Sequence, residues 1–267
     1  MNALNQRFGA VETPVNRIGK TGAALDSIAV ETPIAFVYNG EAHAVMMATP
    51  RDLEDFAFGF SIAEGIVDRV ADIGAVSVEA KGPGIGLSIE ISQGHAALLD
   101  SRKRNVAGRT GCGLCGIAEI EQVLRSLPDL SSGAPISRAA IDRAIRDLPQ
   151  QQEINQQTGA VHAAGFADRD GKLLFVREDV GRHNALDKLI GAVLRAGLNP
   201  ADGFVVVTSR CSMEMVQKTA CFGAPLLVTV SAPTSLAIEL ADKCNMTVAA
   251  FARGSGFNLY THSERII

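Results

Sequence analysis

The chain is 267 residues long, with 47% hydrophobic residues, 20% charged residues and a formal net charge of -4. This composition is typical of a soluble globular protein with a sizeable core, and it excludes a disordered tail. Sequence-independent binding of nucleic acid depends on Lys and Arg side chains that neutralise phosphates, so the negative charge favours a protein without a nucleic-acid partner.

The N-terminal residues and the longest uncharged stretch contain no pattern typical of export or membrane insertion. Residues 1–10 include Asn, Gln and Arg but no apolar segment of the kind found in signal peptides. The uncharged stretch Thr219–Ile238 approaches the length of a membrane span, but Pro225 and Pro233 interrupt it, and we interpret it as a strand, a turn and the start of a helix. We therefore expect a cytoplasmic protein with no membrane contact.

The first half mixes short strands with one amphipathic helix. Asn39-Gly40 is a typical two-residue hairpin turn between β-rich stretches. Thr49 is the predicted N-cap of the helix, because Pro50 suits the first helical position and apolar residues then recur at helical spacing. The predicted elements are strands at Leu25–Tyr38, Glu41–Ala48, Val76–Glu79 and Gly86–Ile91, and a helix over residues 50–64.

In the second half, a helix and a β-hairpin are followed by alternating helices and strands. The hairpin turn is the Asp-Arg-Asp-Gly sequence of residues 168–171. The predicted elements are helices at residues 137–148, 183–196, 212–222 and 234–243, and strands at residues 161–167, 172–176, 204–208, 226–230 and 246–251. Because alternating strands and helices need crossover connections, we predict a mostly parallel sheet with helices on both faces.

Three loops that follow strands of this predicted sheet carry hydroxyl groups, backbone N–H groups or Arg. They are Thr208-Ser209-Arg210, Ser231–Ser235 and Arg253–Gly256. Ligands of open α/β sheets collect at the carboxyl ends of the strands, and these groups are suited to phosphates. Each loop taken singly is also an ordinary turn with a helix cap. The residues alone therefore leave both a binding role and a structural role open.

Residues 111–116, Gly-Cys-Gly-Leu-Cys-Gly, place two thiols three residues apart among three glycines. An apolar helical pattern follows, so Cys115 is expected near a helix N-terminus, and basic residues precede the motif at positions 102, 103, 104 and 109. Both features favour the thiolate over the thiol, and they would also stabilise an anionic persulfide. The motif predicts a nucleophilic thiol, Cys112 or Cys115, on a backbone that glycine leaves free to move.

Two other interpretations compete for this pair of thiols. A structural zinc site takes four ligands, usually from two such pairs, and Cys211, Cys221 and Cys244 have the wrong spacing for a second pair. Those three cysteines lie in apolar settings typical of core cysteine, so we expect no structural metal. A thioredoxin-like redox dithiol is the other interpretation, and the residues alone do not separate it from a nucleophilic thiol.

Seven of the twelve residues from Arg177 to Lys188 are ionisable. Such a run is usually a solvated face. This run, however, lies at a predicted junction of strand and helix, where a bound anion or a general acid/base would be placed. His183, near the helix start, is therefore the candidate site residue among the five histidines.

Four blocks of the chain, in order, resemble the FdhD-type formate dehydrogenase accessory sulfurtransferases of the FdhD/NarQ family. The blocks are Arg109–Gly116, Thr158–Ala164, Glu178–Lys188, and Ser209-Arg210 together with Glu214–Lys218. A single Cys-x-x-Cys motif would be a weak signal, whereas four blocks in order are a strong one. The resemblance extends from about residue 25 to the C-terminus.

The resemblance implies a cytoplasmic sulfurtransferase that takes sulfur from a cysteine desulfurase as a persulfide. The sulfur would pass to the molybdenum or tungsten bis-guanine-dinucleotide cofactor, which the formate dehydrogenase catalytic subunit needs in sulfurated form. A guanine nucleotide is expected to mimic this cofactor. Cys112 would carry the persulfide, and Cys115 would assist relay or release. A homodimer is expected from the same resemblance.

The family's cofactor-binding segment corresponds to residues 251–256, which include one of the three loops described above. The expected cofactor-binding residues, from this segment, the other two loops and the charged run, are Phe251, Ala252, Arg253, Gly254, Ser255, Gly256, Ser209, Arg210, Thr234, Ser235 and His183.

The second half of the family is similar to the cytidine deaminase fold. We therefore expect a three-layer α/β/α cofactor-binding domain at residues 136–267, preceded by a smaller α/β domain at residues 1–135 that ends in the Cys-x-x-Cys loop and its helix. Zinc deaminases carry His-x-Glu at one helix start and Pro-Cys-x-x-Cys at the next. Here residues 183–185 are His-Asn-Ala and residues 210–214 are Arg-Cys-Ser-Met-Glu. The missing Glu and Cys disfavour deamination.

Two alternatives to sulfur transfer stay open at this point. A chaperone that binds the cofactor and docks on formate dehydrogenase without moving sulfur would need Arg253 and the Ser231–Ser235 loop but neither thiol. A redox protein would instead use a reversible disulfide between Cys112 and Cys115.

Overall fold

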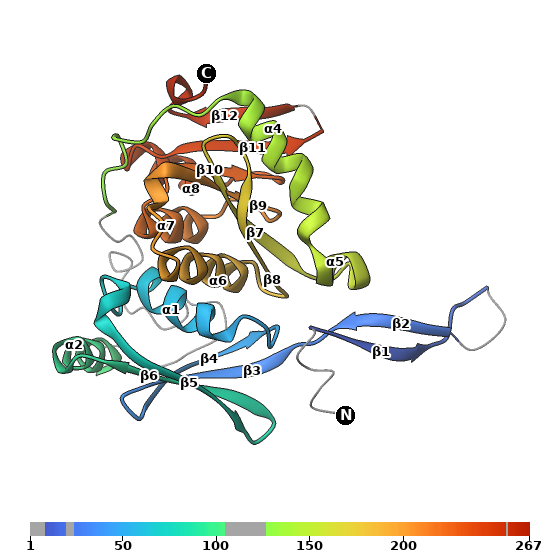
Figure 1. Cartoon of the computed structure of the whole chain (residues 1–267), viewed down its shortest axis with the longest axis vertical. Helices are drawn as coiled ribbons and strands as arrows, with labels where there is room; N and C mark the ends of the chain where they lie inside the picture. The colour runs from blue at the N-terminus through green and yellow to red at the C-terminus, as the bar shows by residue number, and fades with distance from the viewer. Residues whose placement is uncertain (1–8, 20–23, 105–126, 255) are drawn as a thin grey trace.

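The computed structural model describes residues 9–19, 24–104, 127–254 and 256–267. In this part of the chain the strands form a two-stranded, a four-stranded and a six-stranded sheet. Figure 1 shows helices between the two larger sheets and a hairpin that projects from the first half. Among the described residues, no helix combines the length and the apolar character that crossing a bilayer requires.

The four-stranded sheet is built on the hairpin predicted at Asn39-Gly40. Both turn residues have positive φ, 48° and 87°, as a tight turn between antiparallel strands requires. The middle strands, β3 and β6, pair in parallel, and the two outer pairings are antiparallel. In spatial order the strands are β4 (Glu41–Ala48), β3 (Thr32–Tyr38), β6 (Gly84–Ile91) and β5 (Ile73–Lys81).

Helix α1 (Leu53–Ala63) covers one face of this sheet. The rings of Phe56 and Phe60 pack on Phe36 of β3, with centroids 4.9 and 4.2 Å apart. The helix is confirmed, but the predicted N-cap is wrong: Asp52, with φ of 55°, is the N-cap, and the helix begins at Leu53. Thr49 instead bonds the second half of the chain, because its N–H donates to Asp179.

Two elements of the first half were not predicted, strand β1 (Ala10–Val15) and helix α2 (Gln93–Arg104), which follows β6. The strand predicted at Leu25–Tyr38 is divided into β2 (Ala24–Ala29) and β3, and β2 pairs antiparallel with β1 as a separate hairpin. Leu99 of α2 is buried in the same core as α1.

The second half has the predicted order of a helix, a hairpin and then alternating helices and strands. Helix α5, between α4 and β7, and strand β12 were not predicted; the chain turns after β11 and returns antiparallel to it as β12. The helices are α4 (Arg138–Asp147), α5 (Glu153–Thr158), α6 (Arg182–Arg195), α7 (Met213–Phe222) and α8 (Ser235–Lys243). The strands are β7 (His162–Asp168), β8 (Leu173–Asp179), β9 (Gly203–Val207), β10 (Leu226–Thr229), β11 (Thr247–Arg253) and β12 (Gly256–Thr261).

The six-stranded sheet is mixed, with the strand order β12-β11-β10-β9-β7-β8. β10 pairs in parallel with β9 and β11, whereas β7–β8, β7–β9 and β11–β12 are antiparallel. The prediction of a mostly parallel sheet is therefore wrong. The physical reason is that short turns join β7 to β8 and β11 to β12, and a short turn can join only antiparallel strands. The likeness to the cytidine deaminase fold stays a prediction.

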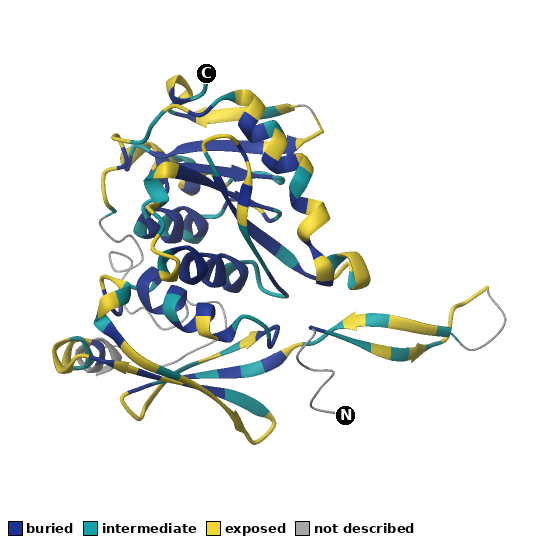
Figure 2. Ribbon diagram, in the orientation of Figure 1, coloured by how far each residue is buried: buried dark blue, intermediate teal, exposed yellow. Residues whose placement is uncertain are grey.

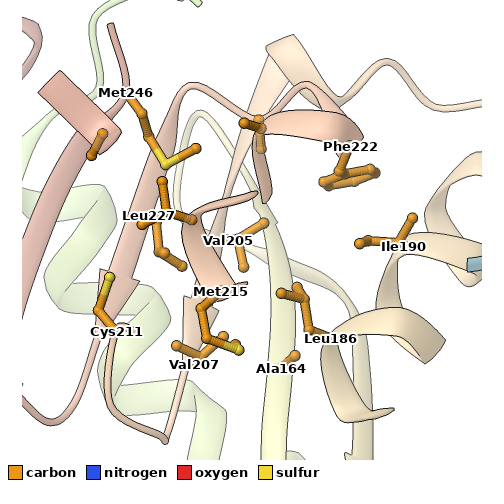
Figure 3. Packing of buried hydrophobic residues seen from close by; sticks show 14 of the residues in the cluster. Ala164, Leu186, Ile190, Val205, Val207, Cys211, Met215, Phe222, Leu227 and Met246 are labelled. Carbon is orange, nitrogen blue, oxygen red and sulfur yellow. The ribbon is translucent and has the colours of Figure 1, made fainter. Parts of the chain in front are cut away.

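Side chains of β9 alternate between two cores on the two faces of this sheet. Val205 and Val207 pack with α6, α7 and α8, whereas Phe204 and Val206 pack with α4 on the opposite face. Figure 3 shows Val205 and Val207 among side chains of the first core, and Figure 2 shows that the central strands are buried throughout. Burial on both faces explains why β9 is uniformly apolar in sequence.

The two halves of the chain meet where α1 crosses α6, and two glycines lie at the crossing. A Cβ atom on Gly59 would lie 1.7 Å from the carbonyl oxygen of Asp187, and a Cβ on Gly191 would lie 1.9 Å from that of Asp55. The helix backbones are therefore in direct contact, and no larger residue fits at either position. The domain boundary expected near residue 135 stays a prediction.

Candidate functional site

The three loops singled out in the sequence lie at one edge of the six-stranded sheet. β9, β10 and β11 are parallel, so they end at the same edge. β8 is antiparallel to β7, which is antiparallel to β9, so β8 also ends there. This carboxyl edge consequently gathers residues 180–183, 208–212, 231–235 and 253–256.

Backbone hydrogen bonds join neighbouring loops of the carboxyl edge. The N–H of Cys211 donates to Ala232 O at 3.1 Å, and the N–H of Thr234 donates to Cys211 O at 3.0 Å. The Thr229 hydroxyl donates to the carbonyl of Ser209. Arg253 Nε donates to Val230 O at 3.0 Å. The loops are therefore held in fixed relative positions before any ligand arrives.

Phe251 has an unusual backbone at this edge. Its φ is 55°, in the left-handed region that a bulky residue seldom adopts, and its side chain is 45% exposed. The pairing of β11 with β12 is irregular between Ala250 and Arg253, which is where such a conformation is accommodated. The backbone thus directs an aromatic ring toward solvent beside Arg253, an arrangement that recurs at functional sites.

The expected cofactor-binding residues differ in accessibility. Ser209 and Ala252 are buried, and the Ser209 hydroxyl donates to Arg210 O, so neither side chain faces solvent. Thr234 caps α8 by accepting a hydrogen bond from Ala237 N. Ser255 lies outside the described residues. The residues exposed at the carboxyl edge are Arg210, Thr234, Ser235, Phe251, Arg253, Gly254 and Gly256.

His183 lies in the first turn of α6, at the same edge. The N-cap residue of α6 is Gly181, which has no side chain. The first backbone N–H groups of α6 therefore receive no hydrogen bond from a capping side chain. Burial lowers the pKa of the His183 imidazole to about 4, and the positive charges of Arg182 and Lys218 act in the same direction. The imidazole is consequently neutral near pH 7.

Two buried polar atoms beside the start of α6 have no hydrogen-bond partner among the described residues. They are Nε of Arg182 and Nε2 of His183. A carboxylate oxygen of Glu214 of α7 lies 4.0 Å from Nε2 of His183. Buried polar atoms are nearly always hydrogen-bonded in native proteins, so these two atoms indicate a place where a ligand or water binds.

Arg182 and Glu214 lie in the sequence blocks that carry the family resemblance, but they are not among the expected cofactor-binding residues. Each lies in the first turn of a helix that follows a strand of the six-stranded sheet. That position was the available signal, because ligands of such sheets bind at these helix starts.

The rest of the charged run does not form a solvated face. Asp179 and Lys188 are fully buried, with Lys188 Nζ 2.6 Å from Asp179 Oδ2. Asp179 also accepts hydrogen bonds from the N–H groups of Thr49 and Gly181 and from the Asn184 amide. Lys188 Nζ also donates to Thr49 O, and burial lowers the pKa of its ammonium. This network joins the two halves of the chain.

A second buried network lies behind His183. Lys218 of α7 donates to Asp187 of α6 at 2.8 Å and to Glu64, which follows α1, at 2.7 Å. Burial raises the pKa of Asp187 to about 7, against the opposing effect of the Lys218 ammonium. The same ammonium lowers the pKa of His183, after the larger effects of burial and of Arg182, whereas Glu64 of this network acts in the opposite direction.

Potential metal ligands gather elsewhere in the described part of the chain. Ligand atoms of Asp68, Asp72 and His95 lie within 4.8 Å of one another in the first half, although Asp72 also pairs with Arg69. At the carboxyl edge, His183 and Glu214 are a pair of potential ligands, with Nε2 of His183 4.0 Å from a carboxylate oxygen of Glu214.

Two of the three described cysteines, Cys211 and Cys244, are core residues. Cys211 and Cys244 are buried and Cys221 is half-buried. Burial raises the pKa of the Cys211 thiol to about 12 and also raises that of Cys244. Neither is a thiolate near neutral pH, so neither is suited to act as a nucleophile. The predicted nucleophiles Cys112 and Cys115 lie outside the described residues.

The chain after the cysteine motif is anchored at the edge opposite the candidate site. Leu127 packs against the core formed with α6, α7 and α8. Leu130 N donates to Cys244 O, and Asn245 Nδ2 donates to Asp129 at 2.9 Å. Because residues 244 and 245 precede β11, this anchor lies at the start of that strand, whereas the candidate site lies at its end.

Comparisons with known proteins agree on one family. The model of the FdhD/NarQ family matches residues 29–267. A sulfur carrier protein FdhD of Xanthomonas campestris pv. campestris strain B100 is 53% identical over 262 residues, which cover 97% of this chain and 93% of the relative. A sulfur carrier protein FdhD of Bordetella petrii is 48% identical over 252 residues, 94% of this chain and 91% of the relative.

A solved structure has the same fold over nearly the whole chain. It is a crystal structure described as a formate dehydrogenase accessory protein from Desulfotalea psychrophila, and its TM-score is 0.74 at 27% sequence identity. The match covers 97% of this chain and 98% of the solved one. The likeness therefore includes both halves and their relative placement.

Proposed function

Because the chain belongs to the FdhD/NarQ family, we propose that it is a sulfur carrier that serves formate dehydrogenase, acting as a sulfurtransferase through a persulfide on Cys112. The observation that carries the proposal is the carboxyl edge. It gathers exposed Arg210 and Arg253 with the polar atoms of Arg182 and His183 that have no partner among the described residues, from three separate parts of the sequence. Such an edge is suited to the anionic groups of a nucleotide substrate.

Loading begins at a cysteine desulfurase that carries a persulfide. The Cys112 thiolate attacks the outer sulfur, the S–S bond of the donor breaks, and the donor cysteine leaves as a thiolate. Cys112 then holds the sulfur as its own persulfide, and no net oxidation is needed. Cys115 assists relay or release. The basic residues at positions 102, 103, 104 and 109 favour the ionised sulfur before and after loading.

The substrate that receives the sulfur is the molybdenum or tungsten bis-guanine-dinucleotide cofactor. Its pyrophosphate groups are anionic, and guanidinium groups can bind them bidentately. Arg253 already donates its Nε to Val230 O, so its remaining N–H groups are directed by that bond. The Phe251 ring supplies an exposed apolar face beside it. These features support the cofactor as the ligand of the carboxyl edge.

The direct test of the persulfide step is mass spectrometry after incubation with a cysteine desulfurase and cysteine. We expect one added sulfur on Cys112 in the wild-type chain and none in the Cys112→Ala variant. Cys221→Ala is the matched control, because Cys221 is a half-buried thiol outside the motif, and its loading should equal that of the wild type. Undiminished loading of the Cys112→Ala variant would refute the assignment.

The cofactor site can be tested separately with GDP as a mimic of the nucleotide part. We expect Arg253→Ala to raise the Kd for GDP about tenfold or more, equal to about 1.4 kcal/mol of binding free energy. Arg169→Ala is the control, because Arg169 lies in the β7–β8 turn at the opposite edge and pairs with Asp202. An equal effect of both substitutions, measured by calorimetry, would mean that the carboxyl edge is not the nucleotide site.

The second candidate is a chaperone that binds the cofactor and docks on formate dehydrogenase without moving sulfur. The exposed Arg210 and Arg253 of the carboxyl edge fit a cofactor-binding chaperone as well as they fit a sulfurtransferase. It predicts that a Cys112→Ala/Cys115→Ala double variant still restores formate dehydrogenase activity in a strain lacking this protein. We expect no restoration. A redox role would appear instead as a reversible Cys112–Cys115 disulfide in the intact mass under graded glutathione.

A further inference from the structure

A group of polar side chains surrounds Arg182 at the carboxyl edge. Burial lowers the pKa values of His162 and His183, and the nearby positive charge of Arg182 lowers both further. Burial opposes ionisation of the Glu214 carboxyl, but hydrogen bonds at the start of α7 and the charge of Arg182 hold its pKa below the ordinary value. The Arg182 cluster, as we define it, consists of these four residues.

The four residues of the cluster come from three elements that meet on one face of the six-stranded sheet. His162 is the first residue of β7, and Ala164, two positions further, packs in the core with α6 and α7. Because the side chains of a strand alternate between its faces, His162 is on the same face as these helices. Arg182 and His183 begin α6, and Glu214 lies in the first turn of α7.

The Arg182 cluster offers a ligand both hydrogen-bond donors and an acceptor. Nε of Arg182 and Nε2 of His183 are buried without a partner among the described residues. The Glu214 carboxylate is ionised near neutral pH, and its side chain is 23% exposed. It lies 4.0 Å from Nε2 of His183, which is too far for a hydrogen bond. A ligand that reaches this place therefore meets an accessible carboxylate beside a guanidinium.

The charges of the Arg182 cluster differ from those of the two exposed arginines at the same edge. The cluster has one positive charge, one negative charge and two imidazoles that are neutral near pH 7. A phosphate bound there would lie beside the Glu214 carboxylate, and like charges repel. Arg210 and Arg253 instead supply two positive charges, which suit a pyrophosphate. The cluster therefore suits the uncharged base of a nucleotide, and the two arginines suit its phosphates.

The spacing of the strands fits this division between base and phosphates. Glu214 follows β9, Arg253 ends β11, and β10 lies between these two strands. Neighbouring strands are about 4.8 Å apart, so the two positions are separated by about 10 Å. One nucleotide can extend across such a distance, with its ribose between the base and the pyrophosphate.

Guanine is the base that complements a carboxylate beside a guanidinium. Its N1–H and 2-amino groups are adjacent donors, which one carboxylate can accept together. Its O6 and N7 atoms are acceptors that a guanidinium binds bidentately. Adenine places the acceptor N1 where guanine has a donor, and this atom would face the lone pairs of the carboxylate. We propose that Glu214 and Arg182 recognise one guanine base of the substrate, an inference that rests on the proposed function.

The test is calorimetric titration of the full chain with GDP and with IDP, which lacks only the 2-amino group. We expect the wild type to bind IDP about tenfold more weakly than GDP, because the carboxylate then loses one of its two donors. Glu214→Ala should weaken GDP binding and bring the two dissociation constants within about twofold of each other. Glu214→Gln, which keeps the size of the side chain at the start of α7, should also reduce the ratio. Circular dichroism confirms that each variant is folded.

Two further variants separate recognition of the base from other roles. Glu239→Ala is the matched control, because it removes an exposed glutamate from α8 of the same half, and it should leave the ratio at about tenfold. Arg253→Ala should weaken GDP and IDP alike and so keep the ratio, since its proposed contact is with phosphate. A purely structural role of Glu214 would lower both affinities without changing their ratio, and that result would overturn the proposal.

Other outcomes distinguish this inference from the proposed function. Equal affinities of the wild type for GDP and IDP would overturn recognition by Glu214 and leave the phosphate contacts of the carboxyl edge intact. Absence of GDP binding to the wild type would instead overturn the cofactor site, and this inference with it. Persulfide loading of Cys112 is measured independently of both.

Discussion

The carboxyl edge and the junction between the two halves are both rich in charged groups, but they differ in how those groups are satisfied. At the junction, Asp179 accepts hydrogen bonds from four donors, and its partner Lys188 also bonds Thr49 O. At the edge, Arg182 Nε and His183 Nε2 are buried without a partner among the described residues. Complete networks stabilise a fold, whereas incomplete ones are where ligands bind.

The comparison matters because one short run of sequence, residues 177–188, contributes residues to both regions. Asp179 and His183 are four positions apart, yet the first is fully buried and the second is partly exposed at the carboxyl edge. Substitutions at the junction should therefore change stability, and substitutions at the edge should change ligand binding.

The largest effect is expected at the junction for Lys188→Met. Removing the ammonium leaves the Asp179 carboxylate buried without its countercharge, which typically costs about 3–5 kcal/mol of unfolding free energy. Lys172→Met, at an exposed lysine, should change it by less than about 0.5 kcal/mol. Chemical denaturation measures both, and an equally small change in the two variants would mean that the pair contributes little.

At the edge, His183 should make stability depend on pH. Its pKa is about 4 in the folded chain and about 6.5 when unfolded, so the unfolded chain binds the proton first as the pH falls. Unfolding free energy should drop between about pH 6.5 and 4, by about 3 kcal/mol at most, and not change above pH 6.5 on this account. His183→Gln should flatten that part of the curve, and an unchanged slope would contradict the low pKa.

Close backbone packing at the junction is tested by Gly59→Ala. The added Cβ would overlap the Asp187 carbonyl, and helices forced apart in this way lose about 1–3 kcal/mol or more. Gly94→Ala is a control in helix α2, where the new Cβ would meet only Ser92 Oγ, at 3.9 Å. That variant should be neutral or slightly more stable, because Ala favours helix. Thermal unfolding distinguishes the two, and equal melting temperatures would argue against the tight crossing.

The smallest change in stability is expected for Arg182→Ala at the edge. Its unpartnered Nε contributes no hydrogen bond within the described chain, so unfolding free energy should change by less than about 0.5 kcal/mol. The same variant should bind GDP more weakly. A large loss of stability with unchanged GDP affinity would assign Arg182 to the junction instead of the edge.

Local sequence patterns predicted much of the fold. The turn at Asn39-Gly40 and the apolar spacing of α1 are properties of a few neighbouring residues, and both were recognised. Residues 256–261 form the strand β12, which the sequence analysis did not predict, and most of its residues are exposed instead of alternating between buried and exposed. Whether two strands pair parallel or antiparallel depended on the length of their connection, and the short turns after β7 and β11 make those pairings antiparallel.

The candidate site was predictable to a similar degree. Motif order indicated the loops at residues 208–210, 231–235 and 253–256, because each follows a strand. It could not show that Ser209 and Ala252 are buried while Arg210 and Arg253 are exposed, since that depends on neighbouring strands and loops.

By itself, the sequence determined the periodicities, the turns and the order of elements, because each of these is set by residues adjacent in the chain. Only the tertiary structure decided which charged groups are buried with a partner and which are left accessible at the carboxyl edge. Thr49 and Asp179 are 130 residues apart and form one hydrogen bond, and no local pattern records such a contact. The free energy of a buried charge depends on its partners, and packing alone selects them.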